Sequence, residues 1–163
     1  MLMLSTAAIA QIEEASTLDA LDWFTGEWVG EGRHEGQDKL EGYARIYVTP
    51  VTEKSFSTTF HWNMPWNNHV HYAFTVFRET EMGVSAKGIH YGPDFNTFED
   101  HPWEFELSDQ SAQHVSFQCV AHCRAKGVTF RLLENGSLEE RWTPLKEDDP
   151  DFIVTYQRQA DQL

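Results

Sequence analysis

The sequence predicts an all-β domain, an antiparallel up-and-down barrel of about ten strands with an N-terminal helix. After Gly26, short alternating or aromatic-rich runs follow one another, with Gly, Pro, Asn and Asp between them. No long stretch of helical periodicity interrupts these runs. Because an open meander of this length would leave two exposed edges, we expect it to close. The expected strands are 27–36, 41–49, 54–62, 69–79, 83–91, 102–108, 112–121, 127–133, 138–143 and 152–158.

Length, charge and hydropathy limit the classes of protein that fit. The 163 residues, 40% of them hydrophobic, suit one domain, with residues 1–25 as a helical segment and 26–163 as the barrel. The formal net charge of −14 argues against a nucleic-acid partner, whose binding needs clustered cations. No apolar run reaches the roughly 20 residues of a transmembrane helix. We therefore expect neither a nucleic-acid partner nor a membrane span.

The N-terminal segment is predicted to be helical and to belong to the mature protein. Its apolar residues recur at helical spacing, Thr17 can cap a second turn, and Gly26 can end the helix. No Lys or Arg precedes Arg33, whereas a secretory signal needs a basic start. Two cysteines form no disulfide framework, and Cys119 alternates with apolar residues as a core residue would. We therefore expect a cytoplasmic protein.

One hairpin register follows from the turn Asn135-Gly136. A two-residue loop would mix polar and apolar residues on each face, whereas a three-residue loop with Gly136 in the left-handed conformation would not. The second register is therefore preferred. It predicts the pairs Leu132–Leu138, Val128–Trp142 and Arg131–Glu139.

A family resemblance rests on the stretch Leu21-Asp22-Trp23-Phe24-Thr25-Gly26-Glu27-Trp28-Val29-Gly30-Glu31-Gly32. It resembles the opening of lipocalin-like (calycin) barrels, a short helix followed by Gly-x-Trp. In its W-x-G-x-G continuation it is similar to nitrobindin-type and related uncharacterised bacterial lipocalin-like barrels. The resemblance implies that Trp28 plugs one end of the barrel under an arginine from a late strand, with Arg141 and Arg158 as the two candidates.

The resemblance also bears on haem. Nitrobindin-type proteins ligate haem through a histidine near the C-terminus, but the last histidine of this sequence is His122. Haem binding by that route is therefore not expected.

Five of the eight histidines lie between positions 61 and 101. A symmetric hairpin after strand 54–62 would place His61 opposite His69. The next hairpin would place His71 opposite His90. The resulting face combines histidines with small residues and Phe77: Ser57, Thr59, His61, His69, His71, Ala73, Thr75, Phe77, Ala86, Gly88 and His90. The opposite face is apolar and aromatic: Phe56, Phe60, Trp62, Val70, Tyr72, Phe74 and Val76.

Two interpretations of these faces compete. In the first, the aromatic face is the packed interior and the histidines lie outside in solvent. In the second, the small residues line a cavity ringed by imidazoles, and the aromatic face is covered by the N-terminal helix or by another subunit.

Converging imidazoles would support metal or acid–base chemistry. Three or four imidazole nitrogens are typical ligands of transition metals such as zinc. The candidate ligands are His61, His69, His71 and His90. Alternatively, one histidine could act as a general acid or base near neutral pH.

The segment between Tyr91 and Glu104 is long for a hairpin loop and combines turn formers, aromatic residues and carboxylates. It is either a lid that brings Glu99, Asp100 or His101 to the histidines, or a self-packed surface loop.

Three functions are consistent with these patterns. The first is a barrel that encloses a small hydrophobic or amphipathic ligand, with few polar groups among apolar walls. Its candidate ligand-binding residues are Trp28, His61, His69, His71, His90 and His101. The second is a histidine-dependent enzyme, with or without a metal, that uses the same cavity. The third is a homodimeric structural subunit without a ligand.

Overall fold

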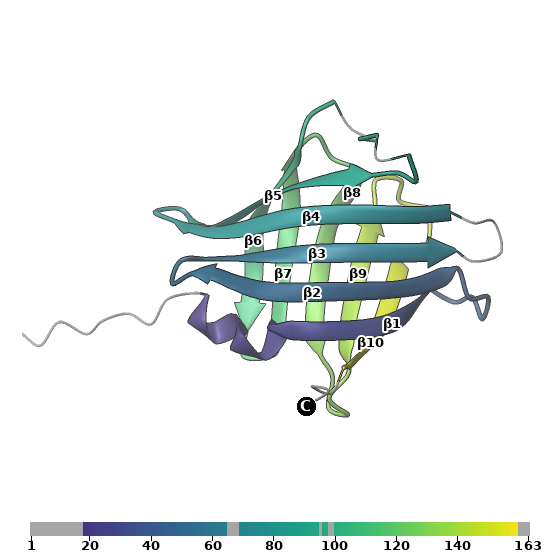
Figure 1. The fold of residues 1–163 in the computed structure, drawn as a ribbon, viewed down its shortest axis with the longest axis horizontal. Helices are drawn as coiled ribbons and strands as arrows, with labels where there is room; N and C mark the ends of the chain where they lie inside the picture. The colour runs from purple at the N-terminus through teal and green to yellow at the C-terminus, as the bar shows by residue number, and fades with distance from the viewer. Residues whose placement is uncertain (1–17, 65–68, 95, 98–99, 160–163) are drawn as a thin grey trace, which may run out of the picture.

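The computed structural model describes residues 18–64, 69–94, 96–97 and 100–159, which form one closed antiparallel barrel of ten strands (Figure 1). Each strand pairs with the next along the chain, and β1 pairs with β10 to close the barrel. The strands are β1 (Gly26–His34), β2 (Gly42–Thr52), β3 (Ser55–Met64), β4 (His69–Thr80), β5 (Gly83–Tyr91), β6 (Trp103–Ser111), β7 (His114–Ala121), β8 (Ala125–Leu132), β9 (Leu138–Pro144) and β10 (Phe152–Arg158).

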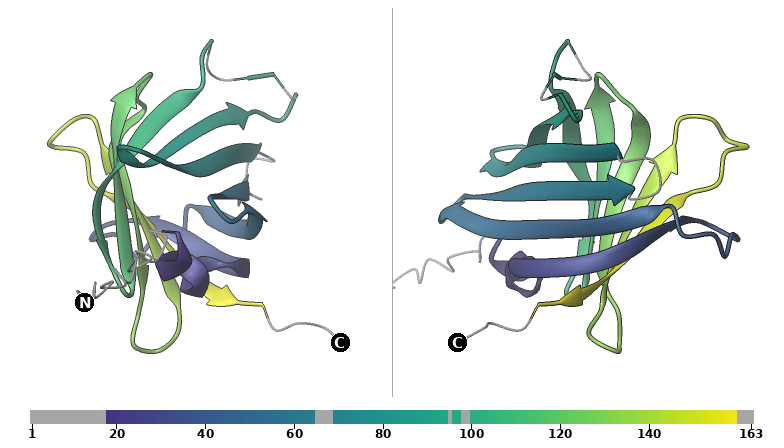
Figure 2. Two further views of the ribbon diagram at one scale, coloured as in Figure 1. Left: turned by 90° about the vertical axis from the view of Figure 1, so that its left-hand side faces the viewer. Right: turned by 45° about the vertical axis from the view of Figure 1, so that its right-hand side comes forward.

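The predicted fold class is confirmed, and each expected strand overlaps one observed strand. Strands β1–β5 form one wall and β6–β10 the other, and the strands of the two walls cross (Figures 1 and 2). The hydrophobic core lies between the walls. Among the described residues, no helix is long and apolar enough to cross a membrane.

The helical element within the described residues is short. It is a 3₁₀ helix, η1, at Asp19–Phe24, which packs at the start of β1. The longer N-terminal helix was predicted over residues that fall mostly in 1–17, outside the described part of the chain.

Trp28 and Arg158 close the end of the barrel next to η1, here called the closed end. The Trp28 side chain is fully buried, and its Nε1–H donates a hydrogen bond to the Phe24 carbonyl at 2.9 Å. The Arg158 guanidinium lies 4.3 Å from the centroid of the Trp28 ring. It also donates to the carbonyls of Trp23 at 2.6 Å and Thr25 at 2.8 Å. Arg158 therefore holds η1 and Trp28 together.

This geometry decides between the two candidate arginines. Arg141 lies elsewhere on the barrel, where its guanidinium binds Glu35 at 2.8 Å and Asp151 at 2.9 Å. These hydrogen bonds raise the pKa of Arg141 above its usual range. The arginine over the tryptophan is thus Arg158.

The predicted register of the β8–β9 hairpin is confirmed. Leu132 pairs with Leu138, Val128 with Trp142 and Arg131 with Glu139. Gly136 has a φ of 79°, which is the left-handed conformation that the predicted loop needs.

The predicted register of the β3–β4 hairpin is wrong. β3 continues to Met64, which pairs with His69, so His71 lies opposite Trp62 and His61 lies opposite Tyr72. The offset from the prediction is an odd number of residues, and an odd offset turns one strand's side chains to the other face. His61 therefore points outward, although it was predicted to lie beside His71.

The aromatic side of β3 points inward instead. Phe56 and Trp62 are buried, and Phe60 packs against the core. A Cβ atom at Gly32 or Gly42 would overlap the indole of Trp62. The two glycines thus leave the interior space that this large side chain fills.

The β4–β5 register differs from the prediction by two residues. Phe77 pairs with Ala86, and His90 pairs with Ala73 rather than with His71. An even offset keeps each side chain on its predicted face. His71 and His90 therefore share the inner face, but they do not lie directly opposite each other.

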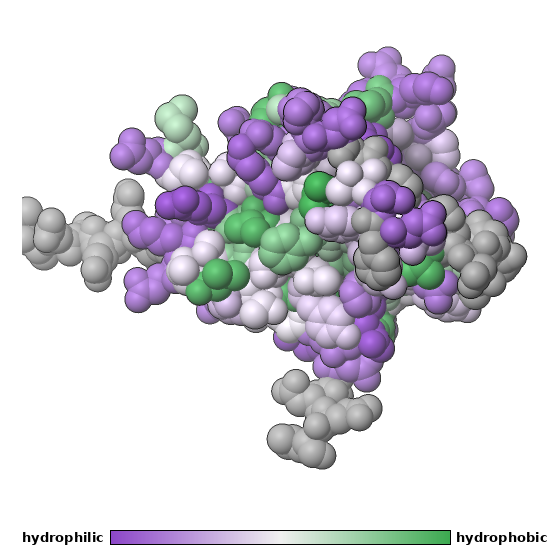
Figure 3. All heavy atoms as spheres, turned by 45° about the horizontal axis from the view of Figure 1, so that its top comes forward, coloured by the Kyte–Doolittle hydropathy of each residue, from purple (hydrophilic) through white to green (hydrophobic). Residues whose placement is uncertain are grey.

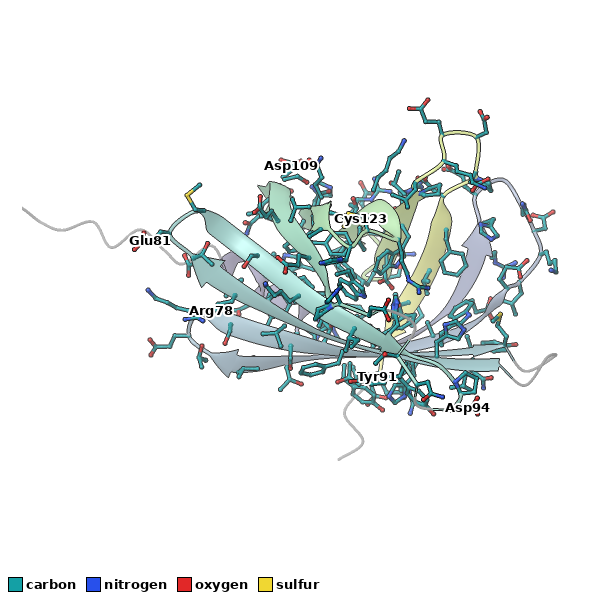
Figure 4. All side chains as sticks on the ribbon, turned by 90° about the horizontal axis from the view of Figure 1, so that it is seen from above. Arg78, Glu81, Tyr91, Asp94, Asp109 and Cys123 are labelled. Atoms are coloured by element: carbon teal, nitrogen blue, oxygen red, sulfur yellow. A yellow bond between two sulfur atoms is a disulfide. The ribbon has the colours of Figure 1, made fainter. Side chains whose placement is uncertain are left out.

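The two cysteines form a disulfide that was not predicted, while Cys119 packs against the hydrophobic core as expected. Cys119 at the end of β7 bonds to Cys123 in the turn before β8. Cys123 is labelled in Figure 4. Structural disulfides are typical of oxidising compartments. The cytoplasmic location stays a prediction.

We predict that replacing Arg158 weakens the closed end of the barrel. Arg158→Met removes the two charged hydrogen bonds and the contact with the Trp28 ring, and should lower the free energy of unfolding by about 1–2 kcal/mol. The control Arg131→Met removes an exposed ion pair with Glu139 and should cost less than about 0.5 kcal/mol. Urea unfolding followed by tryptophan fluorescence measures both. Equal losses would contradict the structural role of Arg158.

Candidate functional site

A small cavity lies inside the barrel, and residues from both walls line it. Its volume is about 30 Å³, which gives room for about two water molecules. Most of its wall is apolar, and a few polar residues interrupt it. The lining residues are Ile46, Thr58, Phe60, Ala73, Thr75, Phe77, Ala86, His90, Trp103, Phe105, Phe117, Val128, Phe130, Glu140 and Trp142.

Glu140 places a carboxyl group in this wall. It lies in the middle of β9 with only 2% of its surface exposed. The Trp142 indole Nε1–H donates to Glu140 Oε1 at 2.9 Å, and the Tyr156 hydroxyl donates to Oε2. Tyr156 is itself fully buried on the neighbouring strand β10. Two neutral donors thus hold both carboxyl oxygens in place.

Burial changes the protonation of this pair. It raises the pKa of Glu140 to about 7, although the hydrogen bonds from Tyr156 and Trp142 act in the opposite direction. Burial also raises the pKa of the Tyr156 hydroxyl well above its usual range, and the neighbouring Glu140 adds to this rise. The carboxyl group therefore exchanges a proton near neutral pH, while Tyr156 stays a hydrogen-bond donor.

Trp103 supplies a second polar group. Its side chain is 5% exposed, and within the described part of the chain its buried Nε1–H has no hydrogen-bond partner. A Cβ atom at Gly88 on the adjacent strand β5 would overlap the Trp103 indole, so the glycine is needed for this ring to lie flat against the sheet. An unpaired buried donor typically costs about 1–3 kcal/mol, which an acceptor in the cavity would offset.

Of the predicted site residues, His90 alone is placed in the wall of this cavity. It is half-buried, and its ring centroid lies 5.5 Å from that of Trp103. His71 is half-buried on the same inner face, farther from the closed end. His69 pairs with Met64, and its side chain lies outside the described part of the structure.

The other predicted residues lie away from the cavity. Trp28 is part of the closed end described above. His101 is exposed in the segment between β5 and β6, and its ring centroid lies 4.8 Å from that of His122, which is also exposed.

His61 lies on the outside of the barrel, between Tyr47 and Tyr72. Partial burial and the charge of Arg45 lower its pKa, so it is neutral at pH 7. It borders an open outer groove of about 1130 Å³. The basic groups of this groove are paired within the chain, Arg33 with Glu31 at 2.8 Å and Arg45 with Glu27 at 3.2 Å.

The structure therefore lacks the predicted strand register, which would have brought together His61, His69, His71 and His90. His61 points to the opposite side of the sheet for the reason of register given above. Within the described residues, no three His, Cys, Asp or Glu side chains gather as metal ligands would.

The loop after β5 contributes no inward side chain among its described residues. It begins at Tyr91, and Asp94 follows in its first turn (Figure 4). Tyr91 pairs with Thr97 across the loop. Asp100 and His101 are exposed rather than directed to the interior. Glu99, the third predicted lid residue, lies outside the described residues.

The inward orientation of Glu140 could have been predicted from the sequence, although the predicted site was based on the histidines instead. The confirmed β8–β9 register puts Leu138 and Trp142 inside, and strict alternation then puts Glu140 inside as well. Trp103 could be found only with the β5–β6 pairing in hand, which sets it opposite Gly88.

The fold of this chain is similar to that of known β-barrel structures. No family model and no curated protein matches the sequence. Among solved structures, Rv2717c from M. tuberculosis is similar with a TM-score of 0.52 and 12% identity over 88% of this chain and 97% of that chain. A redesigned beta barrel has a TM-score of 0.42 and 12% identity, over 89% and 99% of the two chains.

A third similar structure is the tryptamine complex of the amine binding protein of Rhodnius prolixus. Its TM-score is 0.45 and its identity 10%, over 83% of this chain and 63% of that chain. At 12% identity, the likeness to Rv2717c supports the β-barrel fold alone.

We predict that Glu140 makes stability depend on pH. Its pKa of about 7 in the folded chain exceeds the ordinary value of 4.5, so the protonated form favours folding. This contribution is complete below about pH 4.5 and is lost as the pH rises through about 7. Between about pH 5 and pH 9 the free energy of unfolding should fall by about 2–3 kcal/mol relative to Glu140→Gln.

Urea unfolding of both chains across this range measures the difference. Glutamine suits the site because its oxygen can accept from Trp142 and its amide can donate to Tyr156. The matched control is Glu139→Gln, on the outer face of the same strand, which should keep the wild-type slope. Parallel profiles for wild type and Glu140→Gln would contradict the assignment.

Proposed function

We propose that this chain is a ligand-binding barrel that takes a small, partly apolar molecule into its interior, next to His90, Trp103 and Glu140. One observation carries the proposal. A cavity with mostly apolar walls is lined both by Glu140, a buried carboxyl group, and by Trp103, whose buried N–H has no acceptor among the described residues. Few polar groups among many apolar ones is the usual composition of small-molecule sites.

The size of the cavity sets the size of the ligand. At about 30 Å³ it is far below the roughly 300 Å³ at which pockets for drug-sized molecules begin. A ligand of a few heavy atoms fits once it displaces water and the surrounding rotamers adjust. A larger ligand requires movement of the aromatic side chains that line the cavity.

The lipocalin-like family is the finer assignment that we propose for this barrel. Its support is the Gly-x-Trp opening of β1 together with the stacking of Arg158 on Trp28. Both features are those that the resemblance in sequence implies.

Acid–base catalysis is a second candidate function, and the protonation of Glu140 favours it. A carboxyl group with a pKa of about 7 is suited to proton transfer at neutral pH. His90 in the same wall would be the second titratable group of such a site. In this alternative, the group that transfers the proton would be Glu140, whereas the sequence predicted a cluster of histidines for this role.

A homodimer stays a prediction, and one surface bears on it. The outer face of β4 exposes apolar side chains, with Phe74 at 46% and Val76 at 36%. Figure 3 shows hydrophobic residues gathered on this side within a hydrophilic surround. Light scattering of the purified chain would test self-association.

A binding experiment tests the proposed function. In protein labelled with ¹⁵N-tryptophan, small amphipathic probes such as n-propanol and n-propylamine should shift the indole N–H signals of Trp103 and Trp142, which line the cavity. The signal of Trp28 at the closed end should not move.

A variant that fills the cavity sharpens this test. Ala73→Val adds two methyl groups to the wall and should weaken the shifts at least several-fold. The control Thr59→Val, which faces outward on β3, should leave them unchanged. Absence of a shift with every probe, or equal shifts in Ala73→Val, would reject an interior binding site.

A further inference from the structure

The Glu140 carboxyl group has neutral partners on both oxygens. Its donors are the Tyr156 hydroxyl and the Trp142 indole N–H. Among the described residues, no Lys or Arg contributes to its pKa, and burial is the largest influence on it. A buried carboxylate is stabilised most strongly by a paired positive charge. A cationic group in the cavity would supply that charge.

Aromatic rings around the carboxyl group favour the same kind of ligand. The ring centroid of Trp142 lies 6.3 Å from that of Trp103 and 6.2 Å from that of Phe105, and Trp103 and Phe105 are 5.2 Å apart. All three rings line the cavity together with Glu140. The faces of aromatic rings attract ammonium groups and repel anions.

The Trp103 indole adds a second requirement. Its buried Nε1–H needs an acceptor, which an ammonium group cannot provide because it carries donors only. A ligand that satisfies both residues therefore combines a positive nitrogen with an oxygen. The hydroxyl groups of Thr58 and Thr75, also in the wall, can accept further ammonium hydrogens.

We propose that the interior of the barrel binds a small protonated amine that also carries a hydroxyl or carbonyl oxygen. The ammonium group lies against the Glu140 carboxylate, and the oxygen accepts the hydrogen bond of Trp103 Nε1–H. This inference rests on the proposed function, that the cavity takes up a ligand at all. Ethanolamine is the simplest probe with both groups.

The affinity for such an amine should rise with pH. The titratable groups that face Glu140 are Tyr156 from β10 and His90 from β5, while the cavity-lining residues of β8, Val128 and Phe130, do not titrate. Between about pH 6 and pH 8 the ionised fraction of Glu140 increases about tenfold, and an alkylammonium group stays protonated. The affinity for ethanolamine should therefore increase about tenfold.

Calorimetric titration of the full chain with four probes of similar size tests the inference. Ethanolamine should bind more tightly than n-propylamine, and both should bind more tightly than n-propanol and propionate. Glu140→Gln should weaken ethanolamine binding at about pH 8 at least tenfold and remove its pH dependence. Glu139→Gln is the matched control and should do neither, while His90→Asn should keep the rise with pH.

The role of Trp103 has its own readout. The indole N–H proton signal of Trp103 should move downfield with ethanolamine, which offers an acceptor, and less with n-propylamine, which offers none. This measurement uses the wild-type chain and does not depend on whether Trp103→Phe folds.

The outcomes separate the two proposals. If n-propanol binds as tightly as ethanolamine, or if Glu140→Gln binds ethanolamine like wild type, the amine inference fails and the interior binding site stands. If none of the four probes shifts the signals of Trp103 and Trp142, the proposed function itself fails.

Discussion

A carboxyl group enclosed by the barrel sets the chemistry of this interior. Alternation along β9 directs Glu140 inward. Its carboxyl group accepts hydrogen bonds from two neutral donors, the Tyr156 hydroxyl and the Trp142 indole N–H. Removing a carboxylate from water is costly unless its charge is compensated. The low polarity around it therefore couples the proton on Glu140 to the stability of the fold and to whatever occupies the cavity.

Most of the fold could be predicted because local patterns determine it. Alternating runs bounded by turn residues located all ten strands, and Gly136 with its positive φ fixed the β8–β9 register. The same alternation, followed two residues beyond Leu138, puts a glutamate inside. The inward position of Glu140 was not predicted, because a charged residue in a strand is usually exposed, and only the register of the neighbouring residues indicates otherwise.

The register of the β3–β4 hairpin could not be predicted from local sequence patterns. A hairpin that pairs His61 with His69 and one that pairs Met64 with His69 are equally consistent with the residues around them. The offset between the two is odd, so they differ in which face of β3 turns inward. Each predicted interpretation was right for one strand: β3 buries its aromatic side, and β4 buries Ala73 and Thr75 on the face that also carries the half-buried His71. The deciding factor is distant in sequence, since Gly32 and Gly42 provide the volume that Trp62 occupies. Such complementarity becomes visible only when strands from different parts of the chain meet.

The two ends of the interior differ in what their polar groups do for the fold. At the closed end, Arg158 satisfies two carbonyls and covers Trp28, so each contact favours folding. In the cavity, Glu140 satisfies two donors, but its ionised form is buried with no paired positive charge among the described residues, and burial of that charge disfavours folding. Trp103 likewise buries a donor that nothing in the described structure satisfies. Packing alone accounts for the first arrangement and not for the second. Among the described residues, an ionised carboxylate without a paired cation and an indole N–H without an acceptor belong to two side chains that line one small cavity, and the ligand proposed above would complete both.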